Sequence, residues 1–169
     1  MIISILCVDK KFGIGKNNTL LFSLPKDMAF FRSTTLNHVV AMGENTLLSF
    51  PNSKPLKNRT NIVLSGNVSH NYEGVINVHT FQDFLNKIKE YNEKEDVYII
   101  GGASIYHQML PYVDKVLLTK VDADGEATLF FDNLDESPDF ELKSVSEPVL
   151  DGDYSLTFNE YVNINKKSI

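Results

Sequence analysis

Six short and nearly continuous apolar runs constrain the fold of this chain more than any other feature. Most are rich in β-branched residues, and continuous rather than alternating apolar character is typical of strands covered on both faces, as in a parallel sheet. The runs are IISILCV (2–8), HVVAM (38–42), TNIVLS (60–65), VINV (75–78), DVYII (96–100) and DKVLLTKV (114–121). The chain is therefore predicted to form a mainly parallel sheet.

Helical patterns fill most of the gaps between these runs. They cover residues 25–35, 44–50, 80–92 and 103–110. In the third pattern, Phe84, Leu85 and Ile88 share one stripe, and Thr80 with Asp83 has the spacing of a capping box. Strands that alternate with helices predict the α/β class, with a twisted sheet and flanking helices.

The C-terminal part has a different pattern. Residues 140–148 and 154–162 alternate between apolar and polar side chains around the turn sequence LDGD (150–153). This pattern predicts an antiparallel hairpin. A chain of 169 residues suits one domain, which we expect over residues 1–163, followed by a polar C-terminal tail (164–169) that frays.

Composition excludes several classes of function. The net charge of −6 argues against a nucleic-acid groove, which needs a basic face. The single cysteine, Cys7, cannot form an internal disulfide, and its apolar run is too short for a membrane span. The four histidines lack metal-ligand spacing. We therefore expect a cytoplasmic, monomeric protein without a metal and without a nucleic-acid or membrane partner.

Two strand–glycine–helix segments are candidate phosphate sites. In IIGGASIY (99–106), two glycines allow a ligand to approach the backbone, and the following helix start presents free N–H groups. A tight strand-to-helix turn, which any α/β domain needs, is the simpler explanation of the same glycines. In VVAMGENTLLSF (39–50), Thr46 has a hydroxyl for a phosphate, although Asn45 or Thr46 capping the helix is the simpler explanation.

The stretch LLFSLPKDMAFFR (20–32) contains an unusually placed acid. Asp27 follows Pro25 in a first helical turn, where the helix dipole favours an acid. However, Phe30 and Phe31 lie three and four residues on, so they share the Asp27 side of the helix. A partly buried carboxylate needs N–H partners. These come from a protein group or from a flat, nitrogen-rich ligand.

Taken together, these segments resemble the dihydrofolate reductase family over nearly the whole chain. The family pattern combines I-G-K-x-x-x-L-P-W-x-L-P-x-D, M-G-x-x-T, P-L-x-x-R, I-G-G-x-x-[IV]-Y and a late L-T. The matching residues are Ile14-Gly15-Lys16, Leu20, Leu24-Pro25-Lys26-Asp27, Met42-Gly43, Thr46, Pro55-Leu56, Arg59, Ile100-Gly101-Gly102, Tyr106 and Leu118-Thr119. Such an enzyme transfers a hydride from reduced nicotinamide to C6 of dihydrofolate and protonates N5, and it is a target of antifolates.

The resemblance implies roles for the substrate site. Asp27 would pair with the 2-amino and ring N–H groups of the pterin, with Thr119 bonded behind it, and Arg59 would bind the α-carboxylate of the glutamate tail. Leu20 and Phe22 join Asp27 and Thr119 as the implied catalytic set. The implied substrate-binding residues are Ile5, Leu6, Asp27, Met28, Phe31, Ser49, Phe50, Leu56, Arg59, Ile100 and Thr119.

The resemblance also implies a nicotinamide cofactor, with NADPH favoured over NADH. The pyrophosphate would span residues 43–46 and 102–105, the Gly101-Gly102 peptide would be cis, and residues 15–23 would form a loop that closes over the nicotinamide. The implied cofactor-binding residues are Cys7, Ile14, Gly15, Asn18, Leu20, Gly43, Glu44, Asn45, Thr46, Leu64, Ser65, Gly66, Ile100, Gly101, Gly102, Ala103, Ser104, Ile105 and Tyr106.

The chain departs from the family pattern where the cofactor's 2′-phosphate would be bound. Family members usually have cationic groups at positions that here hold Glu44, Gly66 and Ser104. A carboxylate repels a phosphate dianion, whereas an acid near the ribose suits a free 2′-hydroxyl. NADH therefore stays the alternative cofactor.

Two further departures concern the loop, and two other functions stay open. Leu21-Phe22 replaces the family's Pro-Trp, and Glu126-Ala127 replaces a Gly-Asp pair that latches the closed loop. A related pyrimidine-pathway reductase would not need Asp27 together with Arg59, so the presence of both residues favours folate as the substrate. A non-catalytic pterin- or nucleotide-binding relative would bind without turnover.

Overall fold

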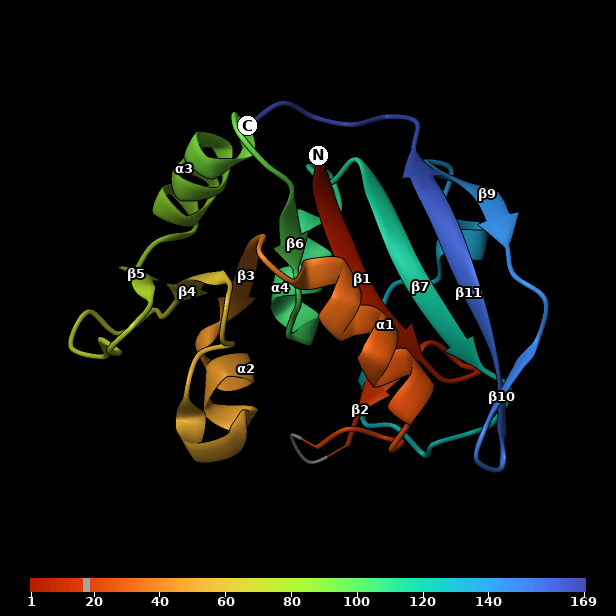
Figure 1. The fold of residues 1–169 in the computed structure, drawn as a ribbon. Coiled ribbons are helices and arrows are strands. Elements are labelled where there is room, and N and C mark those ends of the chain that lie inside the picture. The colour runs from red at the N-terminus through yellow and green to blue at the C-terminus, as the bar shows by residue number, and fades with distance from the viewer. Residues whose placement is uncertain (17–18) are drawn as a thin grey trace.

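The computed structural model describes residues 1–16 and 19–169 (Figure 1). Its helices are α1 (Pro25–Thr35), α2 (Glu44–Ser49), α3 (Phe81–Asn92) and α4 (Ala103–Met109), with short 3-10 turns at Pro51–Ser53 and Leu134–Glu136. Its strands are β1 (Ile2–Val8), β2 (Gly13–Gly15), β3 (Val39–Gly43), β4 (Thr60–Leu64), β5 (Ile76–Val78), β6 (Val97–Ile99), β7 (Lys115–Val121), β8 (Leu129–Phe130), β9 (Phe140–Val145), β10 (Val149–Asp151) and β11 (Tyr154–Asn163).

The predicted α/β fold is confirmed. The main sheet has the order β10-β11-β7-β1-β6-β3-β4-β5, with β9 paired to β11. The six strands predicted from apolar runs pair in parallel, and β1 lies between β6 and β7. Because these strands run in the same direction, their carboxyl ends form one edge of the sheet, where ligands of open α/β sheets bind.

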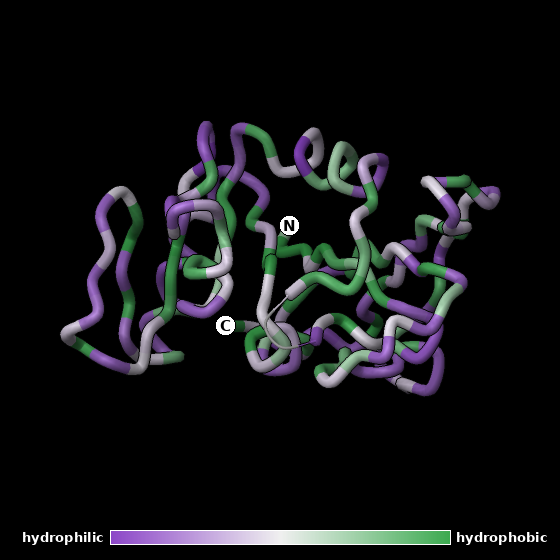
Figure 2. Tube along the Cα trace, turned by 90° about the horizontal axis from the view of Figure 1, so that it is seen from below, coloured by the Kyte–Doolittle hydropathy of each residue, from purple (hydrophilic) through white to green (hydrophobic). Residues whose placement is uncertain are grey.

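Helices cover both faces of the sheet. α1 and α2 pack on one face through Phe31 and Leu47, whereas α3 and α4 pack on the other through Phe84 and Met109 (Figure 1). Figure 2 views the molecule from the side of the carboxyl ends and shows hydrophobic colour along central strands and more hydrophilic colour in the outer loops. Burial on both faces explains why the strands are continuously apolar. Thr80 accepts a hydrogen bond from the Asp83 N–H and caps α3, as predicted.

The C-terminal strands are antiparallel, but they form two pairs rather than one hairpin. β10 pairs with the first residues of β11, and β9 pairs with its later residues. Pro148 separates the two strands and has no N–H for a sheet hydrogen bond. The turn uses Gly152 at φ 64°, a conformation that glycine adopts without steric cost.

Two features differ from the expectation. β2 and β8 form an additional small antiparallel sheet beside the main one. The tail packs back instead of fraying, because the Lys167 N–H donates to the Pro111 carbonyl (2.8 Å) and the Lys166 Nζ lies 3.0 Å from Asp114 Oδ1. Across the described ranges, every helix is too short or too polar to cross a membrane.

Candidate active site

Asp27 and Thr119 meet at the carboxyl-end edge of the sheet. Asp27 is half-buried on α1, and Thr119 is 2% exposed on β7. The Thr119 hydroxyl donates to Asp27 Oδ1 at 2.7 Å. The fold thus brings together two polar residues, 92 positions apart, that the sequence had linked only through a resemblance.

Asp27 is held by a helix start that is capped from elsewhere in the chain. Pro25 begins α1, and the N-cap residue Leu24 offers no side-chain hydrogen bond. Instead, the buried carboxylate of Asp151, from β10, accepts from the N–H groups of Lys26 (2.9 Å) and Asp27 (3.4 Å). Sequence reasoning missed this role, because an aspartate in a hairpin turn already has a local explanation.

The surroundings of Asp27 disfavour its charge. Burial is the main cause that raises the pKa of Asp27, and the nearby Asp151 charge acts in the same direction, while the Thr119 hydroxyl and the Cys7 thiol oppose it. Burial and the charge of Asp27 also raise the pKa of Cys7, so this thiol stays protonated. A carboxylate in this setting gains from further N–H donors.

Most of the apolar residues proposed to bind the substrate pack together. One cluster joins five of the proposed substrate residues from α1, β1 and the segments after α2 and β6: Ile5, Phe31, Phe50, Leu56 and Ile100. Leu6 lies at the edge of the neighbouring core. Phe22 packs edge-on against Tyr154 with ring centroids 4.8 Å apart. Met28 and Leu20 are 47% and 76% exposed. Ser49 bonds back to the Thr46 carbonyl within α2.

Arg59 is fixed beside the C-terminal end of α1. Its Nε donates to Thr35 Oγ1 (2.9 Å), Nη1 to the Lys57 carbonyl (2.6 Å) and Nη2 to the Arg32 carbonyl (3.1 Å). Desolvation, followed by the Arg32 charge, lowers the pKa of Arg59, yet a guanidinium stays protonated in proteins. Each terminal nitrogen retains one further N–H, which together suit a carboxylate.

The two strand–helix junctions proposed as a phosphate cradle lie side by side. The Gly43 N–H donates to the Gly101 carbonyl at 2.8 Å, and the Gly101-Gly102 peptide is cis, as expected. A Cβ at Gly101 would lie 3.3 Å from the Thr46 hydroxyl, and one at Gly43 would lie 3.1 Å from Ile105. α2 has no side-chain cap, so Thr46 does not serve as one. The glycines thus allow the two junctions to pack closely against each other.

The remaining proposed cofactor residues extend from this cradle. Tyr106 is buried on α4 and donates its hydroxyl to the Ile5 carbonyl at 2.8 Å. Ala103 is half-buried, and Ser104 accepts a hydrogen bond from Gln108. Others lie along the strand ends: Cys7, Ile14, Gly15, Leu64 and the buried Ser65, with Asn45 and Gly66 exposed. Asn18 lies outside the described residues.

Asp9 is a second carboxylate that sequence reasoning missed. It is 2% exposed, and its oxygens accept from the N–H groups of Gly13 (2.7 Å) and Gly125 (3.0 Å). A Cβ at Gly125 would lie 2.9 Å from Leu21 Cδ1 and 3.1 Å from Phe22 Cζ. Asp9 thus links β2 to the segment against which the predicted closing loop packs.

Comparisons with known proteins agree with one another. A family model described as dihydrofolate reductase matches residues 1–163. A dihydrofolate reductase of Bacillus subtilis (strain 168) is 34% identical over 137 residues, or 81% of this chain and 79% of that relative. One of Haemophilus influenzae is 37% identical over 121 residues, or 72% of each chain. The solved structure of dihydrofolate reductase from Enterococcus faecalis, complexed with NADP(H) and RAB-propyl, has a TM-score of 0.87 and 28% identity, covering 96% of both chains.

Proposed function

The chain belongs to the dihydrofolate reductase family, and from this premise we propose how its own residues bind and reduce dihydrofolate. The family comprises NADPH-dependent oxidoreductases, and the reaction of this chain adds a hydride to C6 and a proton to N5 of dihydrofolate to form tetrahydrofolate. The observation that carries the site assignment is the half-buried Asp27 carboxylate bonded to Thr119.

Asp27 binds the pterin. Its carboxylate accepts hydrogen bonds from the 2-amino group and the adjacent ring N–H, a planar pair that matches two carboxylate oxygens. Thr119 holds the carboxylate in the required orientation through the 2.7 Å contact. The apolar residues Ile5, Phe31 and Phe50 exclude water from the ring faces, which strengthens the charge-assisted contact.

The glutamate tail of dihydrofolate binds Arg59. The two N–H groups that Arg59 retains bond to the α-carboxylate, while its contacts with Thr35 and Arg32 keep the guanidinium in place. Leu56, a member of the apolar cluster three residues before Arg59, packs against the aromatic ring that joins the pterin to the glutamate. The substrate is thus held at both ends.

The cofactor binds across the cradle formed by Gly43, Thr46 and Gly101, and when bound, NADPH supplies the hydride. The Thr46 hydroxyl and the uncapped N–H groups at the starts of α2 and α4 offer hydrogen-bond donors to a pyrophosphate. Tyr106, bonded to the Ile5 carbonyl, joins the cofactor side to the substrate side. The enzyme therefore contributes placement and exclusion of water to the transfer.

A water molecule delivers the proton to N5. Phe22 and Leu20 carry no N–H or O–H, so neither side chain donates it. Asp27 acts on the pterin's electronic state from the opposite edge of the ring. An antifolate that directs its own amino groups to the Asp27 carboxylate would compete with the pterin for this site.

Dihydrofolate-dependent oxidation of NADPH, followed by absorbance, tests this function. We expect turnover by the unmodified enzyme and at least about a 100-fold loss in kcat/KM for Asp27→Asn, because charge-assisted hydrogen bonds contribute about 1.5–3 kcal/mol each. Asp83→Asn is the matched control, since Asp83 is an exposed acid in the first turn of α3. Absence of turnover from folded enzyme, or equal activity of both variants, would reject the assignment.

A further inference from the structure

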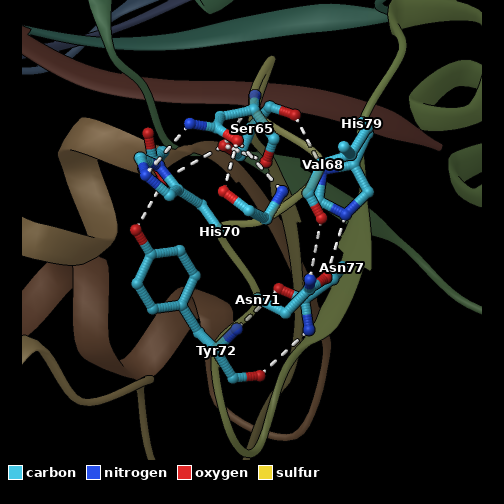
Figure 3. A network of polar contacts seen from close by, with 10 residues as sticks. Ser65, Val68, His70, Asn71, Tyr72, Asn77 and His79 are labelled. Carbon is cyan, nitrogen blue, oxygen red and sulfur yellow. Dashed lines mark hydrogen bonds and ion pairs between the residues drawn. The ribbon is translucent and has the colours of Figure 1, made fainter.

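Glu44 stands at the centre of a polar network beside the proposed cofactor site. It is the first residue of α2 and directly follows β3. Its Oε2 accepts hydrogen bonds from Ser65 Oγ (3.0 Å), His70 Nδ1 (2.8 Å) and the Tyr72 hydroxyl (2.5 Å). Figure 3 shows Ser65, His70 and Tyr72 in this network, which joins the end of β4 to the loop before β5. All three donors are therefore committed to one carboxylate oxygen.

The Glu44 carboxylate faces His70, whose ring is held from its other side by Asn67. Asn67 Oδ1 accepts from the N–H and hydroxyl of Ser69 (3.0 and 2.6 Å), which turns Asn67 Nδ2 toward His70 Nε2 at 3.2 Å. The two ring nitrogens of His70 thus lie against the Asn67 amide and the Glu44 carboxylate. The hydrogen bond from Tyr72 is the main cause that lowers the pKa of Glu44, so the carboxylate is ionised.

The other histidine of the network is also committed. His79 Nδ1 lies 3.0 Å from the Ser65 carbonyl and its Nε2 lies 2.9 Å from Asn71 Oδ1. Asn71 Nδ2 donates to the Val68 carbonyl (3.0 Å), which fixes its amide orientation. Both ring nitrogens of His79 therefore face oxygens of the protein, as Figure 3 shows. Neither ring nitrogen is therefore left for a further ligand.

One oxygen of Glu44 is left to receive a ligand. Within residues 1–16 and 19–169, Oε1 accepts no hydrogen bond, and the Glu44 side chain retains 21% exposure. An acid at the end of a strand in a dinucleotide site accepts a ribose hydroxyl, whereas a 2′-phosphate at the same place requires a cation. A carboxylate and a phosphate dianion repel each other.

We propose that Glu44, held by Ser65, His70 and Tyr72, determines cofactor specificity by accepting the free 2′-hydroxyl of the adenosine ribose and disfavouring a 2′-phosphate. NADH is then a second hydride donor, and the preference for NADPH is small. The proposal rests on the proposed function, in that residues 43–46 and 64–66 bind the adenosine half of the cofactor. Glu44 is a specificity residue and takes no part in hydride transfer.

Calorimetric binding of NADP⁺ and NAD⁺ tests the proposal without turnover. We expect the unmodified protein to bind the two within about tenfold of each other. Glu44→Gln keeps an oxygen acceptor but removes the charge, and it should raise the affinity ratio of NADP⁺ to NAD⁺ about tenfold or more, the size expected for one unit charge near a partly solvated phosphate. The matched control is Glu73→Gln, which removes an exposed acid from the same loop and should leave the ratio unchanged.

A second variant adds charge without disturbing the network. A Cβ at Gly66 would meet no atom within 4 Å, so Gly66→Arg has space for a cation beside the expected 2′-phosphate. It should strengthen NADP⁺ binding about tenfold and leave NAD⁺ binding unchanged. An unchanged ratio in both Glu44→Gln and Gly66→Arg would overturn the role of Glu44, as would strong NADP⁺ selectivity of the unmodified protein.

These outcomes are separable from failure of the proposed function. Dihydrofolate-dependent NADPH oxidation by the unmodified enzyme, together with unchanged binding ratios in the variants, would reject only the inference about Glu44. Binding of neither dinucleotide by folded protein would reject the cofactor site itself, and the role of Glu44 with it.

Discussion

Replacing Thr119 by Val should weaken dihydrofolate binding about 10- to 100-fold while preserving the fold. The Thr119 side chain is buried and branched at Cβ like Val, and the change removes its 2.7 Å hydrogen bond to Asp27 Oδ1. A hydrogen bond to a charged group contributes about 1.5–3 kcal/mol, and about 1.4 kcal/mol corresponds to a tenfold change in affinity. Loss of the donor also raises the pKa of Asp27 further, since this hydroxyl lowers it in the unmodified protein.

Calorimetric titration with dihydrofolate at several pH values would measure this effect. Binding requires the ionised carboxylate, so the variant's deficit should be largest in mild acid and should shrink as pH rises and Asp27 loses its proton. Thr119→Ser keeps the hydroxyl and is the control, and thermal unfolding reports whether each variant is folded. Unmodified affinity in Thr119→Val across the pH range would refute the coupling, and a deficit independent of pH would point to altered packing instead.

Three further changes test other parts of the site. Arg59→Lys should raise KM for dihydrofolate about tenfold with little change in kcat, because an ammonium cannot reproduce the forked contact; steady-state kinetics would show this, and an equal effect on a substrate without the glutamate would contradict it. Asp27→Asn should unfold at a higher temperature than the unmodified protein at neutral pH but not in strong acid. The pKa of Asp27 is raised in the folded state, so the unmodified protein loses stability as pH rises from the unfolded-state pKa through the folded-state pKa, whereas Asn has no charge to bury. Calorimetric scans at both pH values measure the difference. Asp151→Ala should lower the free energy of unfolding, measured in urea, by about 1–2 kcal/mol, because it removes the cap of α1. It should also lower the pKa of Asp27 by removing a like charge, which NMR titration of Asp27 measures. Asp151→Asn should keep most of the cap and lower the pKa of Asp27 equally.

The parts of the fold that follow local rules could be predicted from the sequence. Continuous apolar runs identified the parallel strands because burial on both faces selects such residues, and Thr80 marked the start of α3 through its cap. β2 and β8 escaped detection because they are only three and two residues long, and two of the three residues of β2 are glycines. Their pairing depends on residues distant in the sequence, and strands this short have no periodic apolar pattern by which they could be predicted.

Some features of the candidate site could likewise be predicted from the sequence, and others could not. The resemblance linked Asp27 with Thr119 and the cis Gly101-Gly102 peptide, and the structure contains both features. The sequence could not reveal that Glu44 receives hydrogen bonds from His70 and Tyr72, because those contacts span 26 and 28 positions and depend on how a loop folds back. Side-chain networks built across loops have no sequence spacing of their own.

The capping of α1 by Asp151 has a consequence for the time at which the chain becomes able to bind its substrate during synthesis. The carboxylate follows Lys26, whose N–H it accepts, by 125 positions. Chains emerge from the ribosome with the N-terminal part first, so Asp27 is exposed to solvent long before the hairpin that completes its helix exists. β11, which flanks the strand of Thr119, is made later still. Dihydrofolate or an inhibitor can therefore stabilise chains that already include β10 and β11 but not shorter nascent ones, so any rescue of a destabilised variant by such a ligand begins only once these strands have been made.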